Sequence, residues 1–167
     1  MLLSERGRGA IQLSERRARV RAQPSAEPAV QSPGRNVKVE LAEKIPLARL
    51  DFTLMQQALT NLLLNAVVHT PAGTPILLQV RHEKGSLDFT VADSGLGLPP
   101  ELLPRIFDKF FRAPDAPAGG SGLGLAIVKG FVEAHGGQIS VANRPGGGAI
   151  FSIRIPQTES PPPDNLP

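Results

Sequence analysis

Residues 119–129 read GGSGLGLAIVK, so that four glycines in six residues lead directly into an apolar helical pattern. Glycine lets the backbone approach a ligand closely and adopt positive φ. The start of a helix after such a loop presents free N–H groups and a partial positive charge to an anion. The stretch predicts either a phosphate-binding loop or a flexible linker before an ordinary helix. It matches neither a Rossmann fingerprint, because no strand precedes it directly, nor a Walker loop, because Gly-Lys-Ser/Thr is absent.

The composition indicates one globular domain. The chain has 167 residues, which is enough for one domain with a core, and it has no cysteine for disulfides or thiolate metal sites. No run of 18 apolar residues occurs, so no membrane span is predicted. These features fit a cytoplasmic protein.

Basic charge is concentrated at the N-terminus. Residues 1–35 hold seven Arg and three Glu, whereas the rest of the chain holds 11 basic and 12 acidic residues. No aromatic residue lies among the arginines of 16–21 for base stacking, so we expect a solvated arm and no nucleic-acid partner. We interpret 1–35 as an arm with a Pro/Ala/Ser-rich linker, 36–157 as the folded domain, and 158–167 as a Pro-rich disordered tail.

A long helix is predicted over 51–69, with Asp51 as its N-cap. An apolar stripe runs through Met55, Leu59, Leu62 and Ala66. Asn61 and Asn65 are four residues apart and therefore share one face of this helix. They are interpreted either as amides that cap a neighbouring loop or as a polar stripe whose oxygens face a cation such as Mg²⁺.

Period-two patterns and turn signals predict the strands. The strands over 76–82 and 87–92 flank a Lys84-Gly85 turn, which predicts an antiparallel hairpin. Asp93 and two alternating glycines follow the second of these strands, so Asp93 either accepts a hydrogen bond from an amine such as adenine N6 or closes an Asx turn. The other strands are expected over 37–41, 138–142 and 149–155.

Residues 105–112 read RIFDKFFR and join aromatic and charged side chains. They are interpreted either as a packing segment or as an aromatic docking patch with Lys109 and Arg112 for phosphate. A short helix is expected over 101–107, and a mobile lid over 113–122. A second helix is expected over 122–135, with Ser121 as its N-cap.

Taken in order, four of these stretches resemble the motifs of sensor histidine kinases. Three further segments, 70–76, 133–137 and 143–149, are most similar to the potassium-sensing KdpD kinases. The resemblance covers about residues 36–157. The four motifs are the N box at 61–66, the first glycine box at 93–97, the F box at 106–112 and the second glycine box at 120–128.

This resemblance implies an α+β fold of the Bergerat (GHKL) ATP-binding type: a two-layer α/β sandwich whose mixed, mostly antiparallel sheet carries helices on one face. It implies ATP and Mg²⁺ as cofactors, with Asn65 on the metal and Asp93 on adenine N6. It gives catalytic roles to Asn61, Lys109 and Arg112. The other nucleotide-binding residues that it implies are Asn61, His69, Gly95, Gly97, Gly120, Ser121, Gly122, Leu123, Gly124 and Leu125.

The chain departs from the family pattern at two positions in the first long helix. Leu64 stands where an acidic residue is common, and Val68 stands where Lys or Arg is common. These departures put the catalytic rate in question more than nucleotide binding.

No phosphoacceptor hairpin is expected in this chain, because all three histidines, His69, His82 and His135, fall inside the ATP-binding region. The implied function is a histidine kinase catalytic domain that phosphorylates a histidine on a separate or missing hairpin, with a response regulator downstream. The alternative is a stand-alone binding module or anti-sigma-type serine kinase that sequesters a partner. A gyrase-like ATPase fits less well, because such proteins carry Glu at the position of Asn61.

Overall fold

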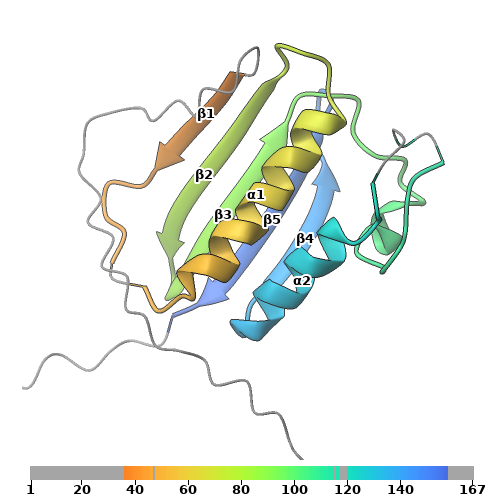
Figure 1. Cartoon of the computed structure of the whole chain (residues 1–167). Helices are drawn as coiled ribbons and strands as arrows, with labels where there is room; N and C mark the ends of the chain where they lie inside the picture. The colour runs from red at the N-terminus through yellow and green to blue at the C-terminus, as the bar shows by residue number, and fades with distance from the viewer. Residues whose placement is uncertain (1–35, 47, 115, 117–119, 158–167) are drawn as a thin grey trace, which may run out of the picture.

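The computed structural model describes residues 36–46, 48–114, 116 and 120–157. Five strands form one sheet in the order β1-β2-β3-β5-β4, with β1 parallel to β2 and the other pairs antiparallel. Both long helices lie on the same face of this sheet (Figure 1). The expected α+β sandwich is therefore confirmed. The elements are β1 (Asn36–Leu41), α1 (Phe52–Val68), β2 (Pro75–Glu83), β3 (Ser86–Asp93), a 3-10 helix (Leu103–Arg105), α2 (Gly124–Ala134), β4 (Gln138–Asn143) and β5 (Ala149–Pro156).

The predicted hairpin is the β2–β3 pair. Its register runs from Ile76 opposite Asp93 to Glu83 opposite Ser86. Lys84 and Gly85 both have positive φ, at 50° and 73°. Two successive positive φ values are typical of a two-residue turn that matches the right-handed twist of the strands. The hairpin therefore fixes the sheet position of Asp93, the last residue of β3.

Helix α1 begins as predicted. The Asp51 carboxylate accepts a hydrogen bond from the Leu54 N–H at 3.0 Å and thereby caps the first turn. The buried stripe of α1 consists of Met55, Ala58, Leu62 and Ala66, whereas the predicted member Leu59 is only half-buried. This stripe packs against the apolar face of the sheet, so the opposite stripe of α1 remains available to solvent.

Helix α2 begins later than the sequence indicates. The prediction of a helix from residue 122 capped by Ser121 is wrong, because α2 starts at Gly124 and its N-cap position is Leu123. Gly122 has φ +69°, and a Cβ on it would lie 2.7 Å from the Phe110 carbonyl carbon. This packing holds Gly122 outside the helix. The Ser121 hydroxyl instead accepts a hydrogen bond from the Leu123 N–H at 3.3 Å.

The short helix expected over 101–107 is a 3-10 helix of three residues. The backbone hydrogen bonds of this region each span three residues: Leu102 to Pro99, Arg105 to Leu102, and Asp108 to Arg105. Pro104 has no N–H to donate to an α-helical turn. The region is thus a series of tight turns.

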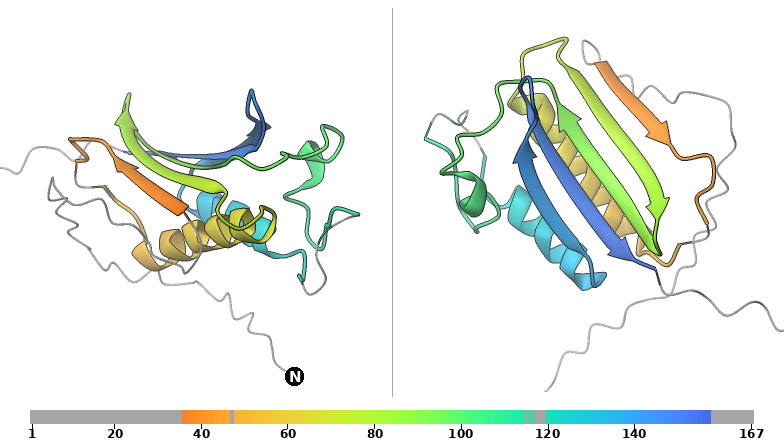
Figure 2. Two further views of the ribbon diagram at one scale, coloured as in Figure 1. Left: turned by 90° about the horizontal axis from the view of Figure 1, so that it is seen from above. Right: turned by 180° about the vertical axis from the view of Figure 1, so that it is seen from behind.

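The face of the sheet opposite the helices is not covered by any described helix (Figure 2). Along β5, Phe151, Ile153 and Ile155 are buried, and Arg154 points to the opposite face. Arg154 forms two hydrogen bonds with Asp88 at 2.9 and 3.1 Å, and these raise the pKa of Arg154. This alternation is typical of an antiparallel sheet with one solvated face. A site on the domain is therefore expected on the helical side.

Candidate nucleotide site

The predicted site segments meet on the helical side of the sheet. The end of α1, the end of β3 and the loop that leads to α2 lie next to one another (Figure 1). A hydrogen bond of 3.5 Å from the Asn61 carboxamide to the Gly124 carbonyl joins α1 to the first turn of α2. The second glycine stretch therefore lies beside the asparagine face of α1.

Asp93 is held in a fixed orientation. Only 7 % of the residue is exposed. Its Oδ1 accepts hydrogen bonds from the Gly95 N–H at 2.8 Å and from the Ala149 N–H at 3.3 Å. Within the described part of the chain, no hydrogen bond is formed by Oδ2. The carboxylate thus combines the predicted Asx turn with an acceptor oxygen that remains for a ligand, so the two interpretations of Asp93 are compatible.

Close packing surrounds Asp93. A Cβ on Gly95 would lie 2.8 Å from the Thr70 methyl group, and a Cβ on Gly97 would lie 2.7 Å from the Asn143 Oδ1. Thr70 is buried, and its hydroxyl donates to the Ala66 carbonyl at 2.6 Å. The two glycines therefore let the loop after β3 pack against α1 on one side and β4 on the other.

Both predicted N-box amides are half-buried on α1. The Asn61 side chain reaches α2, as the loop-capping interpretation proposed, although its 3.5 Å hydrogen bond is long. The Asn65 side chain makes no hydrogen bond to a described residue, and its backbone carbonyl accepts from the His69 N–H at 3.0 Å. The face of α1 that bears Asn65 therefore keeps an amide oxygen for a ligand.

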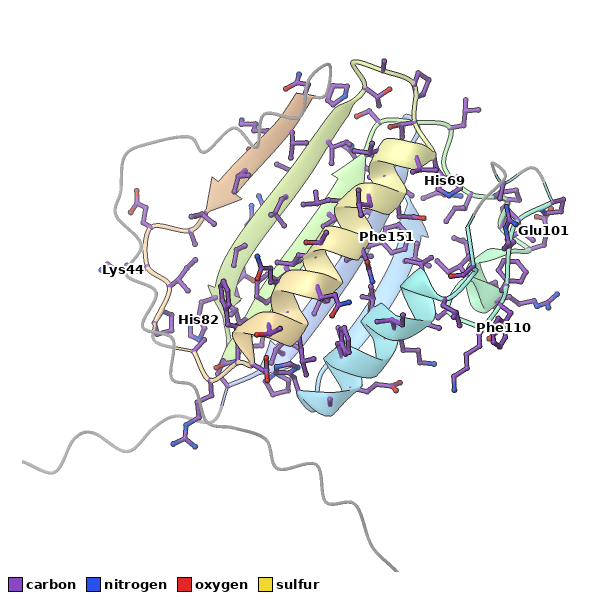
Figure 3. The ribbon with its side chains drawn as sticks, viewed as in Figure 1. Lys44, His69, His82, Glu101, Phe110 and Phe151 are labelled. Carbon is purple, nitrogen blue, oxygen red and sulfur yellow. The ribbon has the colours of Figure 1, made fainter. Side chains whose placement is uncertain are left out.

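The three histidines occupy different parts of the fold. His69 is exposed at the C-cap of α1, on the side of the glycine loops, whereas His82 lies at the far end of the sheet (Figure 3). His135 joins the two helices: its Nε2 accepts from the Asp51 N–H at 2.9 Å, and its Nδ1 lies 2.7 Å from the Phe131 carbonyl. Of the three, His69 alone adjoins the predicted nucleotide residues.

The second glycine box, residues 120–128, borders the site next to the F box. The Gly122 carbonyl accepts from the Phe110 N–H at 3.0 Å, which ties this stretch to the F box. Gly120, Ser121 and Gly124 are exposed, and Leu123 and Leu125 are half-buried. Of the predicted lid at 113–122, residues 115 and 117–119 lie outside the described part of the chain.

The F box divides into core and surface residues. Phe107 is half-buried and packs edge to face against Phe151, with the ring centroids 6.4 Å apart. Phe111 is also half-buried, and the Arg105 guanidinium lies 4.9 Å from its ring centroid. Phe110 is 71 % exposed. Phe107 and Phe111 therefore pack inside the domain, and Phe110 is the phenylalanine of this segment whose ring is available to a partner.

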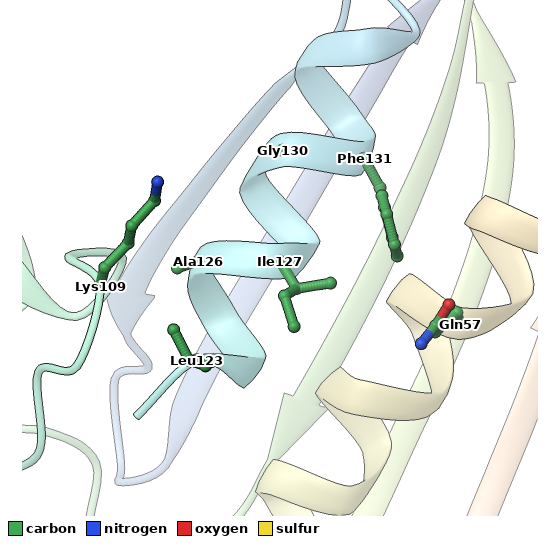
Figure 4. A pocket seen from close by; sticks show the side chains of 7 residues that line it. All are labelled: Gln57, Lys109, Leu123, Ala126, Ile127, Gly130 and Phe131. Carbon is green, nitrogen blue, oxygen red and sulfur yellow. The ribbon is translucent and has the colours of Figure 1, made fainter. Parts of the chain in front are cut away.

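Lys109 and Arg112 are both exposed, and two shallow grooves meet at Lys109. One groove, of about 490 Å³, runs along the outer side of α2 and reaches Gln57 on α1 (Figure 4). The other is lined by the F box and includes Arg112. The structure thus places both predicted cations, Lys109 and Arg112, near the start of α2.

A model of the family described as histidine kinase-, DNA gyrase B- and HSP90-like ATPases matches residues 50–159. The chain belongs to this ATPase family. The matched range includes α1, β3 and the start of α2, so the positions of all the predicted site residues lie inside it.

This ATPase domain is homologous to sensor histidine kinases. It is 41 % identical over 125 residues to the sensor protein KdpD of Clostridium acetobutylicum, an alignment that covers 72 % of this chain and 14 % of KdpD. The chain therefore spans about a seventh of the length of that relative.

Solved histidine kinases share the fold. The catalytic domain of histidine kinase ThkA matches with a TM-score of 0.66 and 30 % identity over 74 % of this chain and 81 % of that one. Full-length ShkA, solved in complex with AMPPNP, matches with a TM-score of 0.66 and 33 % identity over 76 % of this chain and 26 % of ShkA. The ATPase domain is thus of the sensor-kinase catalytic type.

Sequence reasoning did not assign roles to three residues that contact the site. Thr70 packs beside Gly95, and Asn143 and Arg144 bond to the loop after β3. All three fall in the segments that resemble KdpD kinases. The similarity of these segments to KdpD kinases was therefore the sequence signal that pointed to Thr70, Asn143 and Arg144.

Two kinds of feature are absent from the described part of this ATPase domain. It contains no helix that is long and apolar enough to cross a membrane. Nor does it contain a group of three or more His, Cys, Asp or Glu side chains that could together hold a metal ion.

Proposed function

We propose that residues 36–157 bind Mg-ATP and act as the catalytic domain of a sensor histidine kinase, which transfers the γ-phosphate to a histidine on a hairpin supplied by another chain or another part of the protein. The observation that carries this proposal is the Asp93 carboxylate. Two backbone N–H groups hold its Oδ1 and leave Oδ2 as an oriented acceptor beside the glycine loops. Such an acceptor suits the exocyclic amine of adenine.

The metal role proposed for Asn65 fits the side chains present. Because the described residues hold no carboxylate or histidine cluster, this chain offers Mg²⁺ an amide oxygen and no cage. Mg²⁺ typically keeps several waters and binds through few protein ligands together with substrate phosphates. When bound, it would offset phosphate charge. Asn65 would orient it, and Asn61 would position the first turn of α2 through the Gly124 carbonyl.

Asn65→Ala is expected to remove the Mg²⁺ dependence of ATP binding, because it removes the amide oxygen proposed as the metal ligand. Asn61→Ala is expected to reduce transfer more than binding. Calorimetric titration of a non-hydrolysable ATP analogue with and without Mg²⁺ measures the first effect. Wild-type Mg²⁺ dependence in Asn65→Ala would show that the asparagines only support the helix packing.

Phosphate charge is proposed to be offset mainly by Lys109 and Arg112. Leu64 and Val68, the two departures from the family pattern, are 54 and 55 % exposed on α1 and supply no charge there. Phosphoryl transfer depends chiefly on positioning and electrostatic stabilisation. The two exposed cations near the start of α2 therefore support the proposal of phosphate binding.

The hairpin is proposed to dock beside Lys109. Phe110 is exposed on one side of it, and the groove along α2 is lined on the other side by Leu123, Ile127 and Phe131 (Figure 4). An amphipathic helix binds a hydrophobic groove through its apolar face. This surface replaces the three-phenylalanine patch expected from the sequence.

The chain alone is expected to show no histidine autophosphorylation. Transfer requires an acceptor nitrogen in line with the phosphate and about 3–3.5 Å away. His69 caps the C-terminus of the helix that carries Asn65, and His82 lies at the far end of the sheet. His135 accepts a hydrogen bond from the Asp51 N–H at the start of α1. None of them is therefore placed for in-line attack.

Incubation with radiolabelled ATP, alone and with a purified KdpD-type hairpin, tests the proposed function. Acid-labile label on the hairpin and none on this chain is the expected result. A hairpin whose acceptor histidine is replaced by glutamine is the control. Strong acid-labile label on this chain alone that disappears in His69→Ala would contradict both the trans reaction and the nucleotide-binding role implied for His69.

A further inference from the structure

The turn between β4 and β5, residues 144–148, packs directly on the loop after β3. A Cβ on Gly147 would lie 3.1 Å from the Gly95 carbonyl oxygen, and a Cβ on Gly148 would collide with the Asp93 carbonyl oxygen. The turn is closed by the Arg144 N–H, which donates to the Gly148 carbonyl at 2.8 Å. These contacts place the turn behind the carboxylate that is proposed to bind adenine.

We propose that Asn143 and Arg144 are positioning residues that orient Asp93 and thereby set the preference for adenine over guanine. The inference rests on the proposed nucleotide-binding function. Neither side chain is proposed to touch the nucleotide. Both act on the backbone of residues 93–98.

Asn143 holds the far end of this loop. Its Oδ1 accepts from the Leu98 N–H at 2.8 Å, and its Nδ2 donates to the Leu98 carbonyl at 2.7 Å. The carboxamide thus pairs with both polar groups of one residue, as a strand neighbour does. Asn143 is exposed, so water competes for the oxygen and the nitrogen of its carboxamide. Both hydrogen bonds to Leu98 are nevertheless formed, although burial of the side chain does not require them.

Arg144 holds the near end of the loop. Its Nη1 donates to the Asp93 carbonyl at 2.9 Å and lies 3.3 Å from the Ser94 hydroxyl. Arg144 is half-buried, and its own backbone closes the turn that precedes Ala149. One residue therefore ties the backbone of Asp93 to the turn that delivers the Ala149 N–H.

The orientation of the Asp93 carboxylate depends on both segments. Its Oδ1 is held by Gly95, from the loop, and by Ala149, which follows the turn. If the loop and the turn move apart, these two donors no longer meet at one oxygen, and Oδ2 loses its fixed direction. A fixed acceptor favours the amine of adenine and opposes the carbonyl oxygen that guanine carries at the same ring position.

Arg144→Met and Asn143→Leu, which keep side-chain size but remove these hydrogen bonds, test the inference. Each is expected to weaken AMPPNP binding about tenfold and to reduce the preference for AMPPNP over GMPPNP by about the same factor. GMPPNP affinity and the Mg²⁺ dependence of binding should be unchanged. Arg144→Lys, which keeps a donor, is expected to retain most of the preference. Arg154→Met, which breaks an Arg–Asp pair on the solvated face, is the matched control.

Amide hydrogen exchange without nucleotide provides a second readout. In Arg144→Met, exchange at Gly95 and Ala149 should accelerate while the amides of α1 keep their protection. Folded variants that retain the adenine preference, or that lose both nucleotides equally, would overturn the inference alone. If Arg144→Met does not fold, Arg144→Lys and Asn143→Leu decide in the same way. A parent chain that binds no adenine nucleotide would overturn the proposed function and this inference with it.

Discussion

Asp93→Asn is expected to weaken the binding of adenine nucleotides by about 10- to 100-fold, because a hydrogen bond to a charged acceptor contributes about 1.5–3 kcal/mol. The substitution is nearly isosteric. The amide oxygen can still accept from the Gly95 and Ala149 N–H groups, so the loop keeps its anchor. The amide nitrogen then replaces Oδ2 and directs a donor at the donor of adenine.

Calorimetry with a non-hydrolysable ATP analogue measures this loss. Asp88→Asn is the control, since Asp88 is an aspartate of the same strand that pairs with Arg154 on the solvated face. It should leave nucleotide affinity unchanged. Equal affinity of the unmodified chain for ATP and GTP analogues would contradict the assignment of Asp93 to adenine.

Gly148→Ala is expected to lower the free energy of unfolding by about 2–5 kcal/mol, from an overpacking cost of about 1–3 kcal/mol and a left-handed backbone cost of about 1–2 kcal/mol. Gly148 has φ +95°, and a Cβ there would collide with the Asp93 carbonyl and lie 3.0 Å from the Ser94 Cα. These are backbone atoms at the end of a paired strand. They cannot move aside as a flexible side chain would.

Gly146→Ala in the same turn separates the two costs. Gly146 also has positive φ, at 86°, but nothing lies within 4 Å of its added Cβ. It is expected to lose only about 1–2 kcal/mol. Urea unfolding of both variants measures the difference. Equal losses would show that the backbone conformation, and not the contact with Asp93, requires glycine at 148.

The sequence predicted the elements whose signals are local. Alternation and the Lys84-Gly85 turn predicted β2 and β3, and Asp51 predicted the start of α1. The family motifs predicted which segments meet. The start of α2 was mispredicted because it depends on the contact of Gly122 with the Phe110 backbone, which no local pattern encodes.

The support of the site was harder to predict for a related reason. Arg144 forms a hydrogen bond with Asp93, which lies 51 residues earlier in the sequence, and Asn143 forms one with Leu98, which lies 45 residues earlier. Neither residue belongs to a periodic apolar pattern, and a Pro-Gly turn gives no indication of what packs on it. Phe107 illustrates the same limit, because the composition of residues 105–112 left both a packing segment and a docking patch open. Only its contact with Phe151 shows that Phe107 packs against the core.

Because of the way β1 is attached, the resistance of the domain to a pulling force depends on the direction of that force. This strand is held to the sheet by β2, in a parallel register of six residue pairs from Asn36–Pro75 to Leu41–Val80. Tension applied at Asn36 along the strand loads all six pairs in shear, whereas tension across the sheet peels them apart one at a time. The same pull would therefore be resisted in one direction and would detach the edge strand in the other. Strand β3, which ends at Asp93, would stay paired with β2 and β5.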